Sequence, residues 1–79
     1  MTTYEFWREI ESGEVWAVEL EDDVVARCRG PLHWSEINPS FLRVGYEYSV
    51  DEASALESRR HAFERLDETT VILIAGSAD

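Results

Sequence analysis

Two arginine residues are set among apolar side chains, where a guanidinium group could bind an anion. Arg8 interrupts a segment of alternating apolar residues, and Arg60 interrupts a run in which Leu56 and Phe63 recur at helical spacing. Because a guanidinium group matches the geometry of carboxylates and phosphates, Arg8 and Arg60 are candidate ligand-binding residues for a small anionic ligand. The alternative is that Arg8 stacks on Trp16 and Arg60 snorkels, so that both charges reach solvent.

The single cysteine and the two histidines are the other side chains that could support catalysis or metal binding. Cys28, His33 and His61 could combine with Glu36 in a metal site, but the chain contains no Cys-x-x-Cys or His-x-x-x-His pair. A cysteine beside a histidine could also act as a nucleophile, although Cys28 is expected to face the core. We therefore predict no catalytic residue, no metal ligand and no cofactor, and a protein that is not an enzyme.

The chain is strongly acidic. Its net charge is -10, and all 7 basic residues are arginine, which either a GC-rich genome or a high-salt cytoplasm would explain. Such a field repels phosphate backbones and anionic lipids, so neither nucleic acid nor a membrane is an expected partner. The lone cysteine and the absence of a recognisable leader indicate the cytoplasm. With 44% apolar residues, residues 1–79 are expected to form one small folded domain.

The elements that must position these side chains begin with a three-stranded meander. Residues 11–13 and 21–23 are predicted to be three-residue hairpin loops, with Gly13 in a left-handed position that glycine favours. Because side chains alternate along a strand, this register gathers most apolar residues on one face. The predicted core face pairs Phe6 with Val18 and Trp16 with Cys28, and it also includes Tyr4, Leu20, Val24 and Ala26.

The same register leaves the opposite face of the meander with more apolar surface than a solvated face needs. One explanation is that the irregular connection over residues 32–48, which is rich in aromatic residues, lies on this face. The other is that the face binds a second copy of the chain or another protein, since tryptophan and arginine are common interface anchors. The predicted interaction surface then consists of Trp7, Val15, Val25, Arg27 and Trp34.

The remaining strands and turns are predicted from composition. The third strand is expected over residues 24–29, ending at Gly30-Pro31, because proline cannot donate to a ladder. Short helical turns are expected at residues 33–37 and 40–43, and a short edge strand over residues 44–48.

The last third of the chain predicts one helix and one strand. Residues 49–52, Ser-Val-Asp-Glu, fit a capping box that opens a helix over residues 51–67. Residues 71–75 are apolar at every position and rich in β-branched side chains, which favours a C-terminal strand covered on both faces.

The order of a strand meander followed by a helix that opens Asp51-Glu52-Ala53 resembles small HicB-like antitoxin domains. This resemblance implies an antitoxin-type regulator, which we keep as an alternative function beside a small anionic-ligand binding domain that uses Arg8 and Arg60.

The predicted fold is α+β and two-layered, with an antiparallel meander of three strands, a C-terminal strand and one main helix on one face. The favoured function is a small acidic protein-interaction module, either self-associating or an adaptor. Its net charge of -10 favours a partner with a basic surface.

Overall fold

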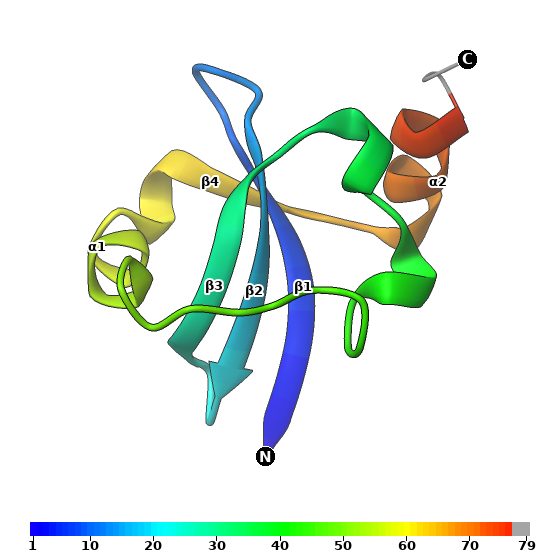
Figure 1. The fold of residues 1–79 in the computed structure, drawn as a ribbon. Helices are drawn as coiled ribbons and strands as arrows, with labels where there is room; N and C mark the ends of the chain where they lie inside the picture. Colours follow the sequence, from blue (N-terminus) through cyan, green and yellow to red (C-terminus); the bar gives the residue numbers. More distant parts are fainter. Residues whose placement is uncertain (77–79) are drawn as a thin grey trace.

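The structure, a computed structural model, describes residues 1–76. Its four strands form one antiparallel sheet in the order β3-β2-β1-β4 (Figure 1). The strands are β1 (Thr2–Glu9), β2 (Val15–Glu21), β3 (Val24–Leu32) and β4 (Phe63–Leu66). The helices are α1 (Ala53–Ser58) and α2 (Glu68–Gly76), with 3-10 helices η1 (Trp34–Glu36), η2 (Pro39–Phe41) and η3 (Arg60–Ala62). The predicted α+β class, with a meander, a further strand from the C-terminal part of the chain and a helix packed on the sheet, is confirmed.

The first hairpin differs from the prediction by one residue. The amide of Gly13 donates to the carbonyl of Glu9 at 2.8 Å, and Gly13 has a φ of 76°. The loop therefore occupies residues 10–13, and the predicted three-residue loop is wrong. Ile10 joins the loop because its amide donates outward, to the carbonyl of Ala62 at 2.9 Å, just before β4. Phe6 consequently pairs with Ala17 instead of Val18.

The second hairpin is shorter than predicted. Asp22 and Asp23 have φ values of 51° and 69°, and Glu21 pairs with Val24, so these two aspartates form the whole loop. Two left-handed residues in a two-residue loop match the twist of the flanking strands, and aspartate tolerates this conformation. An irregularity between Glu19 and Leu20 then shifts the register, so Cys28 pairs with Val18 and not with Trp16.

These shifts change which side chains share a face, because a slip of one residue moves a side chain to the other side of the sheet. Trp7 and Val18 pack together in one buried cluster, and Phe6 and Ala17 pack together in another. The predicted core face, which joined Phe6 to Val18, is therefore wrong. The predicted outer face, which joined Trp7 to Val15, is divided between the two clusters in the same way.

The segment after the meander is only partly as predicted. β3 continues through a cis Gly30–Pro31 peptide to Leu32, beyond its predicted end at residue 29. η1 confirms the predicted turn at residues 33–37, whereas η2 begins at Pro39, before the predicted residue 40. The predicted edge strand over residues 44–48 is wrong, because none of these residues pairs with a strand, and the bridge that follows them joins Ser49 to Cys28.

The predicted helix over residues 51–67 is also wrong beyond its first turns. α1 ends at Ser58, and β4 pairs with β1 so that Phe63 faces Glu9 and Leu66 faces Phe6. The open edge of β1 offers hydrogen bonds and buried contacts that outweigh the helical spacing of these residues. The capping box does not form either, because the Ser49 hydroxyl accepts from the amide of Asp51 at 3.1 Å and α1 starts later.

Residues 71–75, predicted as a strand, lie inside α2. Asp67 caps this helix, since its carboxylate accepts from the amide of Thr70 at 2.7 Å. A short apolar run is compatible with either element, and here the Asp67 cap directly after β4 turns the chain into a helix.

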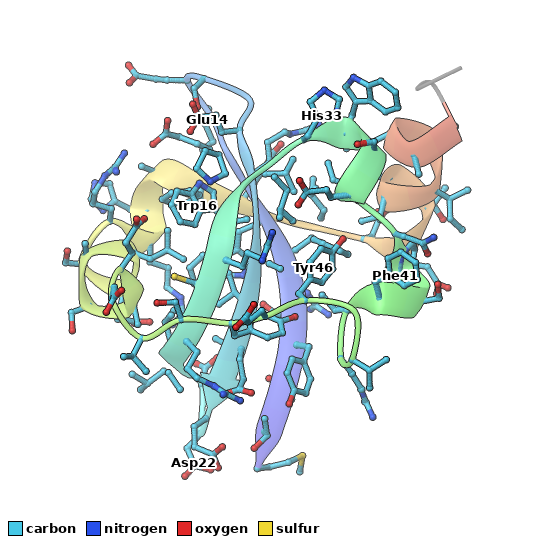
Figure 2. The ribbon with its side chains drawn as sticks, in the orientation of Figure 1. Glu14, Trp16, Asp22, His33, Phe41 and Tyr46 are labelled. Atoms are coloured by element: carbon cyan, nitrogen blue, oxygen red, sulfur yellow. The ribbon has the colours of Figure 1, made fainter. Side chains whose placement is uncertain are left out.

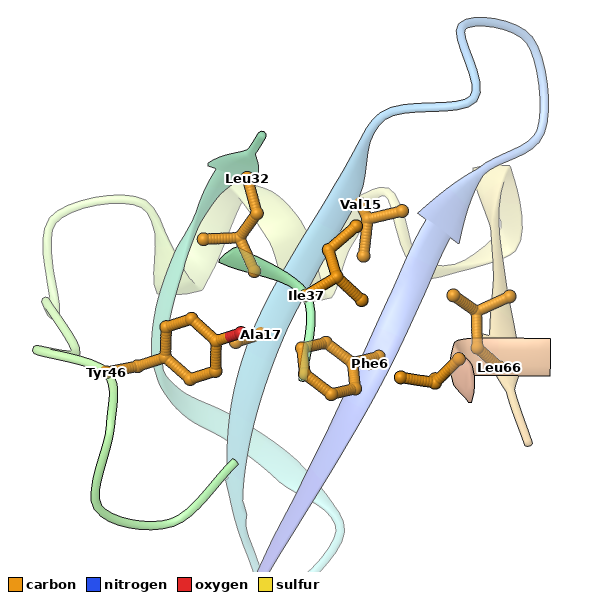
Figure 3. Close-up of a cluster of buried hydrophobic side chains, with 8 residues drawn as sticks. Phe6, Val15, Ala17, Leu32, Ile37, Tyr46 and Leu66 are labelled. Carbon is orange, nitrogen blue, oxygen red and sulfur yellow. The ribbon is translucent and has the colours of Figure 1, made fainter. Parts of the chain in front are cut away.

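Both faces of the sheet are covered by the chain itself. α1 packs against β3 on one side, over the cluster that contains Trp7, Val18 and Leu56. The connection and α2 cover the other side, where Tyr46 lies edge-on to Phe6 with ring centroids 5.9 Å apart. Figure 3 shows this second cluster, whose side chains come from the strands of the sheet, including β4, and from the connection.

Candidate functional site

The two arginines predicted to bind an anion have separate carboxylate partners. Arg8 Nε lies 2.7 Å from Oε1 of Glu64. The guanidinium of Arg60 lies over the Trp7 ring, 5.0 Å from its centroid, and 3.4 Å from a carboxylate oxygen of Glu57. Trp7 belongs to the cluster beneath α1, so Arg60, which lies over its ring, is on the α1 side of the sheet. Neighbouring residues of a strand face opposite sides, so Arg8, the next residue of β1, is on the α2 side. The structure therefore does not bring Arg8 and Arg60 together.

The residues of the predicted interaction surface are dispersed. Trp7, Val15 and Val25 are buried in the two clusters, covered by segments of the same chain. The connection covers Val15, in agreement with the first of the two explanations for the apolar outer face. Trp7 and Val25 instead lie in the cluster beneath α1. Trp34 is exposed, and its ring lies 4.6 Å from that of His33. Of this set, Trp34 offers the largest exposed apolar group.

Arg27 has a structural partner on β2. Its Nε lies 2.7 Å from Oε2 of Glu19, which is the one buried charged side chain within residues 1–76. Hydrogen bonds from Arg27 and from the Tyr4 hydroxyl hold the pKa of Glu19 below its ordinary value, against the opposing effect of burial. Arg27 is therefore needed to compensate a buried carboxylate.

Cys28 is a buried thiol with little nucleophilic character. Burial, together with the nearby charge of Glu52, raises the pKa of Cys28 to about 11. The His33 ring instead lies 2.9 Å from the Ser35 hydroxyl. Residues 1–76 contain no group of three side chains placed to hold a metal ion, and no helix among them is long and apolar enough to span a bilayer.

The largest exposed apolar groups near one another are on α2 and on the two 3-10 helices that contact it. We call Trp34, Phe41, Ile72 and Leu73 the α2 surface. The exposed fractions are 56% for Ile72 and 67% for Leu73, and nearly half for the two aromatic residues. Val71 holds the helix to the core from its other side. Figure 2 shows α2 beside Phe41 and near the start of the connection at His33.

A cavity of about 450 Å³ adjoins the first turn of α2. Its apolar walls come from Phe6, Leu42, Leu66 and Val71. Three carboxylates, those of Glu5, Asp67 and Glu68, and one guanidinium, that of Arg65, also line it. Arg65 Nε lies 3.3 Å from Glu5, so the remaining charge of the lining is negative.

Sequence reasoning identified Trp34 but missed the rest of the α2 surface. Ile72 and Leu73 were assigned to a strand covered on both faces, which would have buried both side chains. One available signal was the composition of residues 68–76, in which the only charged residue is Glu68. A helical segment that is apolar at every position, as residues 71–75 are, needs cover on all sides, and α2 is covered on one.

Comparisons with models of known protein families, with curated proteins and with solved structures found no match.

Proposed function

We propose that this protein is a small non-enzymatic interaction module, an adaptor that binds another protein through the α2 surface. The observation that carries the proposal is the exposure of Ile72 and Leu73 in the part of α2, residues 71–75, that is apolar at every position. Contiguous exposed apolar side chains of this kind are typical of binding surfaces. Trp34 and Phe41 add aromatic groups, which are enriched among the residues that anchor protein interfaces.

The contrast with α1 supports the proposal. α1 buries Ala53 and Leu56 and exposes Ser54, Ala55 and Ser58, as expected of a helix whose outer side meets water. α2 anchors itself with Val71 and leaves larger apolar groups outside. Ile72 and Leu73 therefore contribute little to the fold, and an interaction gives a physical reason for their presence.

The charge of the chain favours a partner with a basic surface over a second copy. Two copies would each carry a net charge of -10, whereas a basic partner would be attracted during encounter. A cytoplasmic location, expected from the single thiol, is part of this proposal.

The experiment uses the tagged full chain, isolated from the cells that produce it, with bound proteins identified and then remixed in purified form. The test variant is Ile72→Gln with Leu73→Gln. The control is Val50→Gln, because Val50 is 65% exposed and precedes α1, at the opposite end of the molecule from α2 (Figure 1). We expect one partner to bind the wild type and the control and to be lost from the double variant.

Two outcomes would contradict the proposal. A partner that binds the double variant as tightly as the wild type would show that the α2 surface is not the binding site. A dimer seen by sedimentation of the wild-type chain alone, and weakened by the double variant, would assign the surface to self-association instead of an adaptor role.

A further inference from the structure

One edge of the sheet is covered over only half its length. β2 pairs with β1 from Thr2 to Arg8, but β4, on the other side of β1, pairs only with the residues from Phe6 to Glu9. No strand within residues 1–76 pairs with the outer edge of β1 at residues 2–5. An unpaired strand edge presents backbone donors and acceptors to any extended chain that approaches it.

The cap of α2 explains why β4 stops short. Asp67 accepts from the amides of Thr70 and Val71, through its side chain and its carbonyl respectively, so the chain turns into a helix directly after Leu66. Leu66 lies opposite Phe6. β1 continues from Phe6 to Thr2, whereas the chain after Leu66 turns into α2 and no longer pairs with β1.

The register shows which backbone groups point to the open edge. Glu9 bonds to Glu14 across the first hairpin, and Ile10 bonds outward to Ala62. Because the backbone groups of successive residues point to alternate sides of a strand, odd-numbered residues of β1 face β2 and even-numbered residues face outward. The amide and carbonyl groups of Thr2 and Tyr4 therefore point away from β2, to the open edge.

The acidic cavity lies at this same edge. Tyr4, Glu5 and Phe6 of β1 form one wall, and Glu68 and Val71 of α2 contribute to another. A chain paired with β1 at Tyr4 would thus have the cavity beside its side chains. The apolar lining suits the aliphatic stem of a lysine or arginine, and the carboxylates suit its charged end.

We propose that an extended, basic segment of the partner protein adds to the sheet as a fifth strand beside residues 2–5 of β1. One lysine or arginine side chain of that segment occupies the cavity between β1 and α2. This inference rests on the proposed function, because α2 borders both the cavity and the α2 surface, so one partner can contact both. Backbone pairing supplies the attachment, and the acidic cavity selects a basic side chain.

Charge decides between this occupant and a second copy of the chain. Antiparallel pairing of two β1 edges would bring two cavities of negative charge together, in a molecule that already carries -10. Like charges on neighbouring strands oppose such pairing.

The first test uses a capped peptide of alternating valine and lysine as the probe, and follows backbone amide resonances of the full chain by NMR. We expect shifts at residues 2–6 and in the first turn of α2. Methylating alternate amides of the peptide blocks one of its two edges, so one methylation pattern should abolish binding and the complementary pattern should not. A peptide with glutamate in place of lysine should not bind.

The second test reverses a charge at the cavity. Glu68→Lys should weaken peptide binding by about fivefold, as expected for one exposed charge pair at low salt. Glu14→Lys is the matched control, since Glu14 is an exposed carboxylate at the first hairpin (Figure 2) and its reversal changes the net charge equally. We expect this control to bind the peptide almost as the wild type does.

The proposal is overturned if the basic peptide does not bind at millimolar concentration, if both methylation patterns act alike, or if the two charge reversals have equal effects. The double variant Ile72→Gln with Leu73→Gln separates this proposal from the proposed function. It should still bind the peptide, because neither residue lines the cavity. Loss of the protein partner with retained peptide binding therefore supports both proposals, and retained partner binding contradicts only the role of the α2 surface.

Discussion

The two faces of the sheet are covered in different ways. On one face, α1 lies over a cluster that includes Trp7, Val18 and Phe63, and its outer side is polar. On the other face, an irregular connection and α2 cover a cluster that includes Phe6 and Tyr46. Exposed apolar groups lie on this second cover, and a cavity beside its first helical turn adjoins the open edge of β1.

The difference separates the residues that build the fold from those available for binding. The α1 face is complete within the chain, because its covering helix buries one side and exposes the other to water. The α2 face has the same kind of core but continues outward into apolar surface. Function is therefore more readily assigned to the α2 side, and the following substitutions measure how far the two sides differ.

The largest expected effect comes from one substitution made on both covering helices. Leu56 in α1 is 4% exposed and Leu73 in α2 is 67% exposed. Leu56→Ala should reduce the free energy of unfolding by about 3 kcal/mol, because it leaves a cavity in the core. Leu73→Ala should change it by less than about 0.5 kcal/mol. Urea denaturation measures both values, and equal losses would show that α2 is as integral to the fold as α1.

A smaller loss of stability is expected from adding one methyl group at Gly30, beside Trp16 on the α1 side of the sheet. A Cβ atom at Gly30 would lie 2.5 Å from a ring carbon of Trp16, whereas one at Gly76 in α2 would meet no atom within 4 Å. Gly30→Ala should therefore destabilise the protein by about 2 kcal/mol through overpacking. Gly76→Ala is the control and should not lower the melting temperature measured by thermal unfolding. An unchanged melting temperature for Gly30→Ala would mean that this packing is loose.

The smallest effect concerns pH and the buried carboxylate on the α2 side. The hydrogen bond from Arg27 lowers the pKa of Glu19 in the folded state. A carboxylate with a lowered folded pKa stabilises the protein above its unfolded pKa of about 4.3, and this contribution disappears as pH falls through the folded pKa. Glu19→Gln should thus be less stable than the wild type by about 1 kcal/mol at pH 7, since its partner Arg27 is half exposed.

Urea denaturation at pH 7 and at pH 3 should show the difference between Glu19→Gln and the wild type becoming smaller in acid. Glu14→Gln, at an exposed position, should show no such change. A difference that stays constant over this range would mean that the charge of Glu19 does not contribute to folding.

The strands of the meander were predictable because alternation of apolar residues is a local property. Their register was not, because it depends on distant contacts. Ile10 belongs to the loop because its amide bonds to the carbonyl of Ala62, which is 52 residues away in the chain. The irregularity beside Glu19 likewise follows from how β2 and β3 pair, and no residue pattern in either strand signals it.

The last third of the chain was harder to predict for the same reason. Phe63 and Leu66 have helical spacing from Leu56, yet they pair with β1, whose free edge exists only in the folded sheet. Residues 71–75 are compatible with either element, and the Asp67 cap that makes them helical depends on where β4 ends. The acidic character of the candidate site was visible in the composition, whereas the α2 surface depended on which element those residues formed.

The open edge of β1 also bears on the colloidal behaviour of the free protein. A bare strand end close to exposed apolar side chains is the arrangement through which folded proteins assemble into unwanted polymers. Mutual repulsion between molecules with 17 acidic and 7 basic residues opposes that assembly. Neutralising the carboxylates in acid, or screening them with salt, should therefore promote precipitation of the native state before the domain unfolds.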